Sequence, residues 1–210
     1  MAAARAPNAV ALLAVSKTFA ADHVRVAYAA GQREFGESYV QEALDKIAEL
    51  SALPLIWHFI GPIQSNKTRL IAEHFAWAHS VAREKIALRL AQSRPQSLSP
   101  LNVCLQVNVS GEASKSGVAP QELRGLAEAV RVLPGLSLRG LMAIPEPSDE
   151  VALQRRRFAA VRSLFDQLNA AGFELDTLSM GMSHDLEAAV MEGATIVRVG
   201  TAIFGERIKR

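Results

Sequence analysis

LLAVSKT, at residues 12–18, contains the end of an apolar run, which is followed by Ser16 and Lys17. The run starts at residue 10, and every residue from 10 to 15 is apolar. A short continuous run of this kind is typical of a strand buried on both faces, as in a parallel sheet. Similar runs recur along the chain, and the predicted strands cover residues 10–16, 34–36, 57–61, 77–80, 102–109, 137–144, 177–179 and 195–199.

Segments with the helical period of 3.6 residues lie between these runs. We predict helices over residues 22–30, 38–50, 65–74, 82–93, 120–132, 150–171 and 184–192. Gly31, Gly172 and Gly193 stand just past three of them, where a helix C-terminus favours glycine. Regular alternation of strands and helices predicts an α/β fold with a parallel sheet. Eight such units predict a single (β/α)8 TIM barrel over residues 1–210, rather than an open doubly wound sheet.

Composition and charge exclude several classes of protein. Of the 210 residues, 50% are hydrophobic and 21% are charged, as in ordinary folded proteins. The formal net charge is +2, far below the basic excess of a general nucleic-acid binder. No apolar stretch reaches the ~18 residues of a membrane helix. The one cysteine, Cys104, is expected to be a buried thiol. We therefore expect a cytoplasmic protein that binds neither nucleic acid nor membranes.

Lys17 stands where a barrel places its chemistry. The working face of a TIM barrel lies at the C-terminal ends of its strands, and Lys17 follows the first predicted strand. Partial burial there disfavours the charged form of a lysine, which makes the amine a usable nucleophile toward a carbonyl. From position alone, a lysine that ends a strand and reaches solvent is the more common case.

Two loops rich in glycine and hydroxyl groups follow the seventh and eighth predicted strands, where barrels often bind phosphate. The first contains Ser183, which we expect to be a helix N-cap. The second begins with Gly200 and Thr201, which offer an unhindered amide and a hydroxyl. Helix N-termini present backbone N–H groups to anions, so the two loops together predict a phosphate site.

Closing a barrel brings its first strand beside its eighth, so Lys17 and this phosphate site are expected to be neighbours. A phosphorylated aldehyde fits both, with its carbonyl on the amine. Pyridoxal 5'-phosphate (PLP) and certain sugar-phosphate aldehydes have this chemistry. Arg198 beside the loop could donate to a pyridine nitrogen, although an interior ion pair explains it equally well.

The histidines predict no metal site, because His23, His74, His79 and His184 show no ligand spacing with cysteine or with a second histidine. His58, in the third predicted strand, has the chemistry of an acid or a base. A hydrogen-bonded structural histidine is the more common case at such a position.

Several motifs, taken together and in order, resemble one known family, the pyridoxal phosphate homeostasis proteins. The resemblance runs from about residue 10 to residue 207. The motifs are LLAVSKT (12–18), FGESYVQEA (35–43), WHFIGPIQSNK (57–67), QVNVSGEASKSG (106–117), GLMAIP (140–145), SMGMSHD (179–185) and VRVGTAIFGER (197–207).

The resemblance implies a barrel similar to the N-terminal domain of alanine racemase, with PLP bound as a Schiff base on Lys17. The family's phosphate contacts transfer to Ser183, Gly200 and Thr201, and its contact to the pyridine nitrogen transfers to Arg198. The implied role is intracellular vitamin B6 balance, as a carrier or buffer of PLP. PLP-dependent apoenzymes are the implied partners, and no residue is assigned a catalytic role.

The chain departs from the family pattern at two places. Ser38 stands where the family has an asparagine near the cofactor, and its shorter side chain loses or redirects one hydrogen bond while binding survives. Nine residues precede the first predicted strand, where the family carries a longer helical segment.

A PLP-dependent amino-acid racemase is the alternative function. A two-base racemase needs a proton donor opposite the lysine, commonly a tyrosine from a second domain. Tyr28 and Tyr39 are the tyrosines available, and both fall in predicted helices. A third possibility, a Schiff-base aldolase, would need further carboxylates at strand ends. Without a second domain we expect a monomer.

Overall fold

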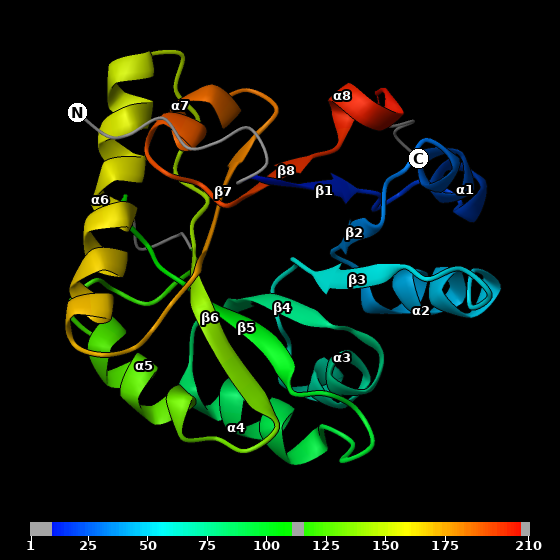
Figure 1. The fold of residues 1–210 in the computed structure, drawn as a ribbon, viewed down its shortest axis with the longest axis horizontal. Coiled ribbons are helices and arrows are strands. Elements are labelled where there is room, and N and C mark those ends of the chain that lie inside the picture. The colour runs from blue at the N-terminus through cyan, green and yellow to red at the C-terminus, as the bar shows by residue number, and fades with distance from the viewer. Residues whose placement is uncertain (1–9, 111–115, 207–210) are drawn as a thin grey trace.

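Eight parallel strands close into a barrel in chain order (Figure 1). The computed structural model describes residues 10–110 and 116–206, so parts of the motifs at 106–117 and 197–207 lie outside the described residues. The predicted (β/α)8 barrel and all of its predicted strands are confirmed. The strands are β1 (Ala11–Val15), β2 (Glu34–Glu37), β3 (Ile56–Phe59), β4 (Trp77–Val81), β5 (Leu101–Gln106), β6 (Leu136–Met142), β7 (Thr177–Met182) and β8 (Ile196–Val199).

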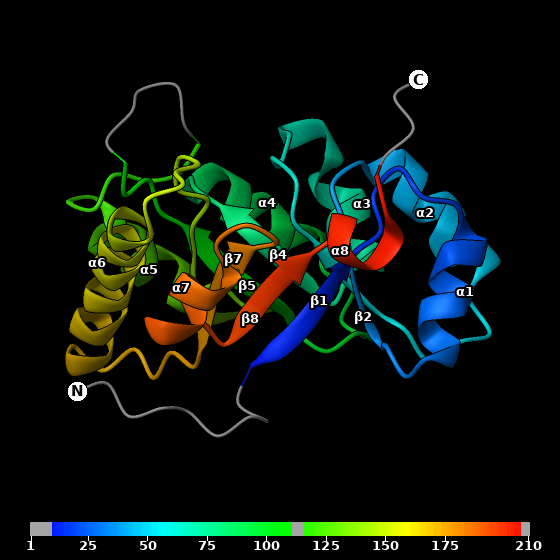
Figure 2. The same cartoon turned by 90° about the horizontal axis from the view of Figure 1, so that it is seen from above.

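Helices follow the strands and cover the outside of the barrel (Figures 1 and 2). The predicted helices are confirmed, and the short α8 is an addition to them. None of the helices in the described residues is long and apolar enough to cross a membrane. The helices are α1 (Ala21–Ala29), α2 (Val40–Glu49), α3 (Thr68–His74) after a 3-10 turn (Ser65–Lys67), α4 (Glu84–Ser93), α5 (Leu123–Arg131), α6 (Val151–Ala170), α7 (Leu186–Met191) and α8 (Thr201–Phe204).

The barrel closes between β1 and β8, which lie side by side in Figure 2. Leu13 pairs with Arg198, and Ala14 pairs with Val199. On the other side of β8, Met182 at the end of β7 pairs with Arg198. The C-terminal ends of β7, β8 and β1 therefore meet at one part of the barrel mouth.

Apolar side chains are buried both outside and inside the barrel. A large cluster packs between the sheet and the helices. Leu13 and Met142 are fully buried and pair with Arg198 and Ser179, so their side chains share the inner face of the sheet. Cys104 is also fully buried, as predicted, and burial raises the pKa of its thiol to about 12.

A chain of polar side chains crosses this interior. Nη1 of Arg198 donates to Oγ of Ser179 at 2.8 Å. The same Oγ lies 2.8 Å from Nδ1 of His79, whose Nε2 lies 2.9 Å from Nδ1 of His58. A serine hydroxyl can donate one hydrogen and accept others, so Ser179 links Arg198 to His79, and His79 links Ser179 to His58. His58 is therefore buried and hydrogen-bonded in the barrel interior, as expected of a structural histidine.

Burial keeps both histidines of this chain neutral. It lowers the pKa of His58 to about 3. Burial also lowers the pKa of His79 well below its usual 6.5, and the nearby His58 and Arg198 act in the same direction. Nε2 of His58 is 3.9 Å from a carboxylate oxygen of Glu34, beyond hydrogen-bond distance.

We expect the fold to lose stability as the pH falls below 6.5. The unfolded chain protonates its histidines near pH 6.5, whereas His58 in the folded chain resists protonation down to about pH 3. The unfolded state binds more protons over this window, so each such histidine lowers the free energy of unfolding by up to about 1.4 kcal/mol per pH unit. Urea unfolding between about pH 5 and pH 7 measures the slope.

Two variants identify the source of this slope. His74→Gln, which changes an exposed histidine, is the matched control. His58→Gln removes one buried titrating group and should flatten the slope, whatever its effect on stability at neutral pH. A slope that is the same with and without His58 would contradict the assignment.

Candidate functional site

The predicted cofactor-binding residues lie at the C-terminal ends of β2, β1, β8 and β7, which are consecutive in the barrel. The structure therefore gathers all of them on one side of the mouth. Lys17 follows β1, Ser38 follows β2, Ser183 follows β7, Arg198 is within β8, and Gly200 and Thr201 follow β8.

The segment that carries Lys17 contacts the helix that Thr201 begins. Lys17 is half-buried, in line with the expectation of partial burial at the mouth. Two residues later, the ring of Phe19 packs on the ring of Phe204 in α8, with 5.2 Å between the ring centroids. The register of β1 with β8 and this ring contact together bring the two segments into one site.

The start of α8 presents backbone N–H groups at the mouth. Gly200 is buried and Thr201, the first residue of the helix, is exposed. The first N–H groups of a helix have no partner inside the helix. Together with the hydroxyl of Thr201, they form a donor set that suits an anion.

Ser183 has a different local role from the one predicted. The N-cap of α7 is Asp185, so the prediction that Ser183 caps this helix is wrong. A carboxylate oxygen of Asp185 accepts the backbone N–H of Met182 at 2.6 Å, which fixes the turn between β7 and α7. Ser183 lies half-buried in that turn, directly after the strand, and its contact with a phosphate stays a prediction.

Arg198 is held at a defined place inside the barrel. Nη1 donates to the carbonyl of Ser179 at 2.6 Å as well as to its hydroxyl, and Nη2 donates to the carbonyl of Ala143 at 3.0 Å. Burial lowers the pKa of the guanidinium to about 10, so it keeps its charge at neutral pH. Within residues 10–110 and 116–206 no ion pair involves Arg198, so the interior ion pair considered from sequence is not what holds it.

The backbone of Ser38, after β2, lies very close to that of Gly61, after β3. A Cβ atom added to Gly61 would lie 2.4 Å from the carbonyl oxygen of Ser38 and 2.8 Å from its Cα. Only glycine at position 61 therefore lets the chain after β3 pass the residue after β2. Ser38 is half-buried beside the end of β1.

Sequence reasoning missed three charged residues at the mouth. Lys46, on α2, is 5% exposed, and Glu37, at the end of β2, is fully buried. Nζ of Lys46 is 2.7 Å from carboxylate oxygens of both Glu37 and Glu42. The sequence signal for this cluster was that Glu42 and Lys46 are four residues apart and so lie on one helix face. Pairs with this spacing are usually exposed, so the signal did not indicate a buried lysine.

The prediction that both tyrosines fall in helices is confirmed for Tyr28 and wrong for Tyr39, which stands just before a helix. Tyr28 is on α1, where the guanidinium of Arg33 covers its ring at 4.1 Å. Tyr39 precedes α2 as its N-cap residue and is 56% exposed. Tyr28 is engaged on an outer helix, and Tyr39 presents its side chain to solvent.

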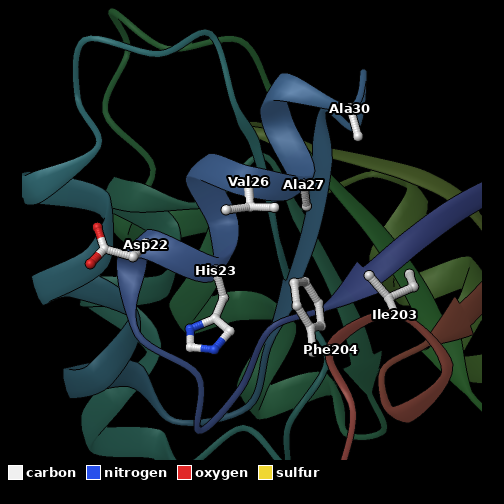
Figure 3. A pocket seen from close by; sticks show the side chains of 7 residues that line it. All are labelled: Asp22, His23, Val26, Ala27, Ala30, Ile203 and Phe204. Atoms are coloured by element: carbon white, nitrogen blue, oxygen red, sulfur yellow. The ribbon is translucent and has the colours of Figure 1, made fainter.

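An apolar hollow of about 400 Å³ lies between α1 and α8. Its walls include His23 and Val26 of α1 and Ile203 and Phe204 of α8, as Figure 3 shows. None of the predicted cofactor residues lines it. The hollow therefore adjoins the site without forming part of it.

The donor set at the mouth fits PLP. Arg198 offers a buried positive donor for a ring nitrogen, and Lys17 offers an amine for an aldehyde. The turn at Ser183 and the start of α8 offer N–H and hydroxyl groups for a phosphate.

Known proteins share both the sequence and the fold of this chain. Residues 1–208 match the family described as alanine racemase, N-terminal domain. The pyridoxal phosphate homeostasis protein of Pseudomonas aeruginosa is 68% identical over 206 residues, covering 98% of this chain and 88% of the relative. The pyridoxal phosphate homeostasis protein of Escherichia coli K12 is 54% identical over 209 residues, covering 97% of this chain and 88% of the relative.

Solved structures agree with this relationship. PipY of Synechococcus elongatus, determined with PLP bound, is 43% identical and superimposes with a TM-score of 0.87 over 96% of this chain and 94% of PipY. Alanine racemase of Clostridium difficile shares the fold, with a TM-score of 0.76 at 14% identity over 96% of this chain and 53% of the racemase. By its sequence and its barrel, the chain belongs to the pyridoxal phosphate homeostasis protein family.

Proposed function

We propose that this protein holds PLP at the barrel mouth, as a Schiff base on Lys17, and serves as a carrier or buffer in intracellular PLP balance. The observation that carries the proposal is the register of β7, β8 and β1, in which Met182 pairs with Arg198 and Ala14 with Val199. This register brings together the strand that precedes Lys17 and the strand that carries Arg198 and precedes Thr201, which supports a site that combines an amine, a buried guanidinium and donors for an anion. PipY, which shares this barrel, has been seen with PLP bound.

Each group has a role that its chemistry supports. The amine of Lys17 attacks the aldehyde carbon, and water leaves as the carbon–nitrogen double bond forms. Ser183, Gly200 and Thr201 bind the phosphate, and Ser38 borders the ring from the end of β2. When bound, PLP supplies a conjugated ring that withdraws electrons. Arg198 donates to the pyridine nitrogen and keeps it unprotonated, which weakens that withdrawal.

Binding is better supported than racemisation. A second acid or base must stand on the far face of the cofactor from Lys17. Tyr28 is covered by Arg33, and Tyr39 is largely exposed at the start of α2. We therefore favour PLP binding over racemisation. We also propose that the protein works as a monomer in the cytoplasm and gives up its cofactor to PLP-dependent apoenzymes.

Reduction with borohydride should fix the cofactor on Lys17. A Schiff base absorbs visible light, and reduction removes the band and leaves a stable pyridoxyl group whose position peptide mass mapping identifies. We expect the label on the peptide that contains Lys17. Lys17→Ala should remove this labelled peptide, and Lys85→Ala, at an exposed lysine of α4, should leave it unchanged. A label found chiefly on another lysine of the wild-type chain would contradict the proposal.

Thr201→Val should weaken PLP binding through the phosphate alone. Valine keeps the volume of threonine and loses the hydroxyl, and a hydrogen bond to a charged group contributes about 1.5–3 kcal/mol, or roughly a tenfold change in Kd or more. Equilibrium titration should show this loss for PLP and little change for pyridoxal, which has no phosphate. Ser163→Ala, at an exposed position of α6, serves as control. An equal loss for both ligands would contradict the phosphate assignment.

We expect no racemase activity from the PLP-loaded protein. Incubation with L-alanine, followed by chiral separation, should give no more D-alanine than the Lys17→Ala variant gives. D-alanine that forms in the wild type and disappears in the variant would favour the racemase instead.

A further inference from the structure

A buried lysine of α2 binds three oxygens from three different segments. Nζ of Lys46 is 2.7 Å from the backbone carbonyl of Ser16, from Oε1 of Glu37 and from Oε1 of Glu42. An ammonium group has three N–H donors, so these oxygens use all of them. The residues Lys46, Glu37 and Glu42 are called the mouth cluster below.

Lys46 occupies a position where the helix pattern calls for an apolar residue. The buried face of α2 consists of Val40, Ala43 and Lys46, spaced three residues apart. A lysine on such a face is costly to bury unless its charge is paired and hydrogen-bonded. Its two carboxylate partners and the carbonyl of Ser16 supply that pairing.

The mouth cluster holds the chain on both sides of Lys17. Before it, the hydroxyl of Ser16 donates to Glu37 at 2.6 Å, and the carbonyl of Ser16 accepts from Lys46. After it, the backbone N–H of Thr18 donates to Glu42 at 2.6 Å. Both neighbours of Lys17 are therefore attached to one set of ion-paired side chains.

The backbone of Thr18 has an unfavourable conformation that contacts with other residues must hold in place. Thr18 has a φ of 70°, a left-handed conformation that is unfavourable for a β-branched residue. A residue keeps such a conformation only when surrounding contacts hold it there, and such strain is concentrated at functional sites. The hydrogen bond from Thr18 to Glu42 is a contact of this kind.

We propose that Lys46, Glu37 and Glu42 are positioning residues that fix the segment from Ser16 to Thr18, so that Lys17 is set for bond formation with the aldehyde of PLP. This inference rests on the proposed function of Lys17. The mouth cluster itself makes no contact with the cofactor in the proposed site. It acts by removing, during folding, the conformational freedom that the segment would otherwise lose when the bond forms.

The paired variants Glu42→Ala and Glu42→Gln test the inference. Alanine removes the acceptor of the Thr18 N–H, whereas the amide oxygen of glutamine can still accept it. The matched control is Glu128→Ala, which breaks an exposed pair of the same spacing with Arg124 on α5. Two ligands are titrated into each protein: PLP, and pyridoxine 5'-phosphate, which has the same ring and phosphate but no aldehyde.

We expect Glu42→Ala to weaken PLP binding about tenfold and to slow the appearance of the Schiff-base band, with Glu42→Gln close to the wild type. Binding of pyridoxine 5'-phosphate should stay within about twofold of the wild type in every variant, since it forms no bond with Lys17. A merely structural role predicts equal losses for the two ligands, and that result would overturn the inference. PLP binding unchanged by Glu42→Ala would overturn it too.

Hydrogen exchange of the cofactor-free protein gives a second readout that needs no ligand. The backbone amide of Thr18 should exchange faster in Glu42→Ala than in the wild type or in Glu128→Ala. An unchanged rate would refute the proposed hold on the segment. Failure of the proposed function itself looks different, because wild-type protein would then carry no borohydride-reducible label on Lys17.

Discussion

The pairing of β1 with β8 is the constraint on which the site depends. Eight parallel strands have no free edge only if the last pairs with the first, and here Leu13 lies beside Arg198. Residues at opposite ends of the sequence thereby become neighbours. Lys17 and Thr201 belong to segments that follow the two paired strands, and the contact between Phe19 and Phe204 joins those segments again outside the sheet.

Two buried polar networks lie on either side of this closure, and each holds one functional group in place. Inside the barrel, the chain from His58 to Arg198 fixes the guanidinium through neutral partners, because burial keeps the histidines uncharged. At the mouth, Lys46 and its carboxylates fix the segment around Lys17. Burial raises the pKa of Glu37, while the ammonium of Lys46 and the hydroxyl of Ser16 oppose this rise. Buried ion pairs contribute little net stability, so their value here is geometric.

Local sequence patterns were sufficient to predict the fold. Apolar runs such as residues 10–15 need no long-range information to be identified as strands, and Gly193 marks the end of its helix, where its φ is 91°. The end of β7 was less predictable, because the glycine and methionines up to Met182 lack the β-branched signal of a strand. That extension displaced the helix start, so Asp185 rather than Ser183 is the cap.

The site was predictable only in part. Lys17, Gly200 and Thr201 follow strong strand signals, so their placement at the mouth could be inferred from sequence. The partners of Lys46 could not, because charged residues four apart on a helix normally face solvent. Its burial depends on the neighbouring turn after β1, which only the folded barrel brings within 2.7 Å. His79 and Ser179 are likewise 100 residues apart and meet only across the closed barrel.

A crystal structure of the PLP-loaded protein tests the central claim most directly. We expect electron density that is continuous from Nζ of Lys17 into the cofactor. We also expect the phosphate within hydrogen-bond distance of Ser183, Gly200 and Thr201, and a guanidinium nitrogen of Arg198 beside the pyridine nitrogen. Cofactor density at another part of the barrel, or at the mouth with the phosphate turned away from the ends of β7 and β8, would contradict it.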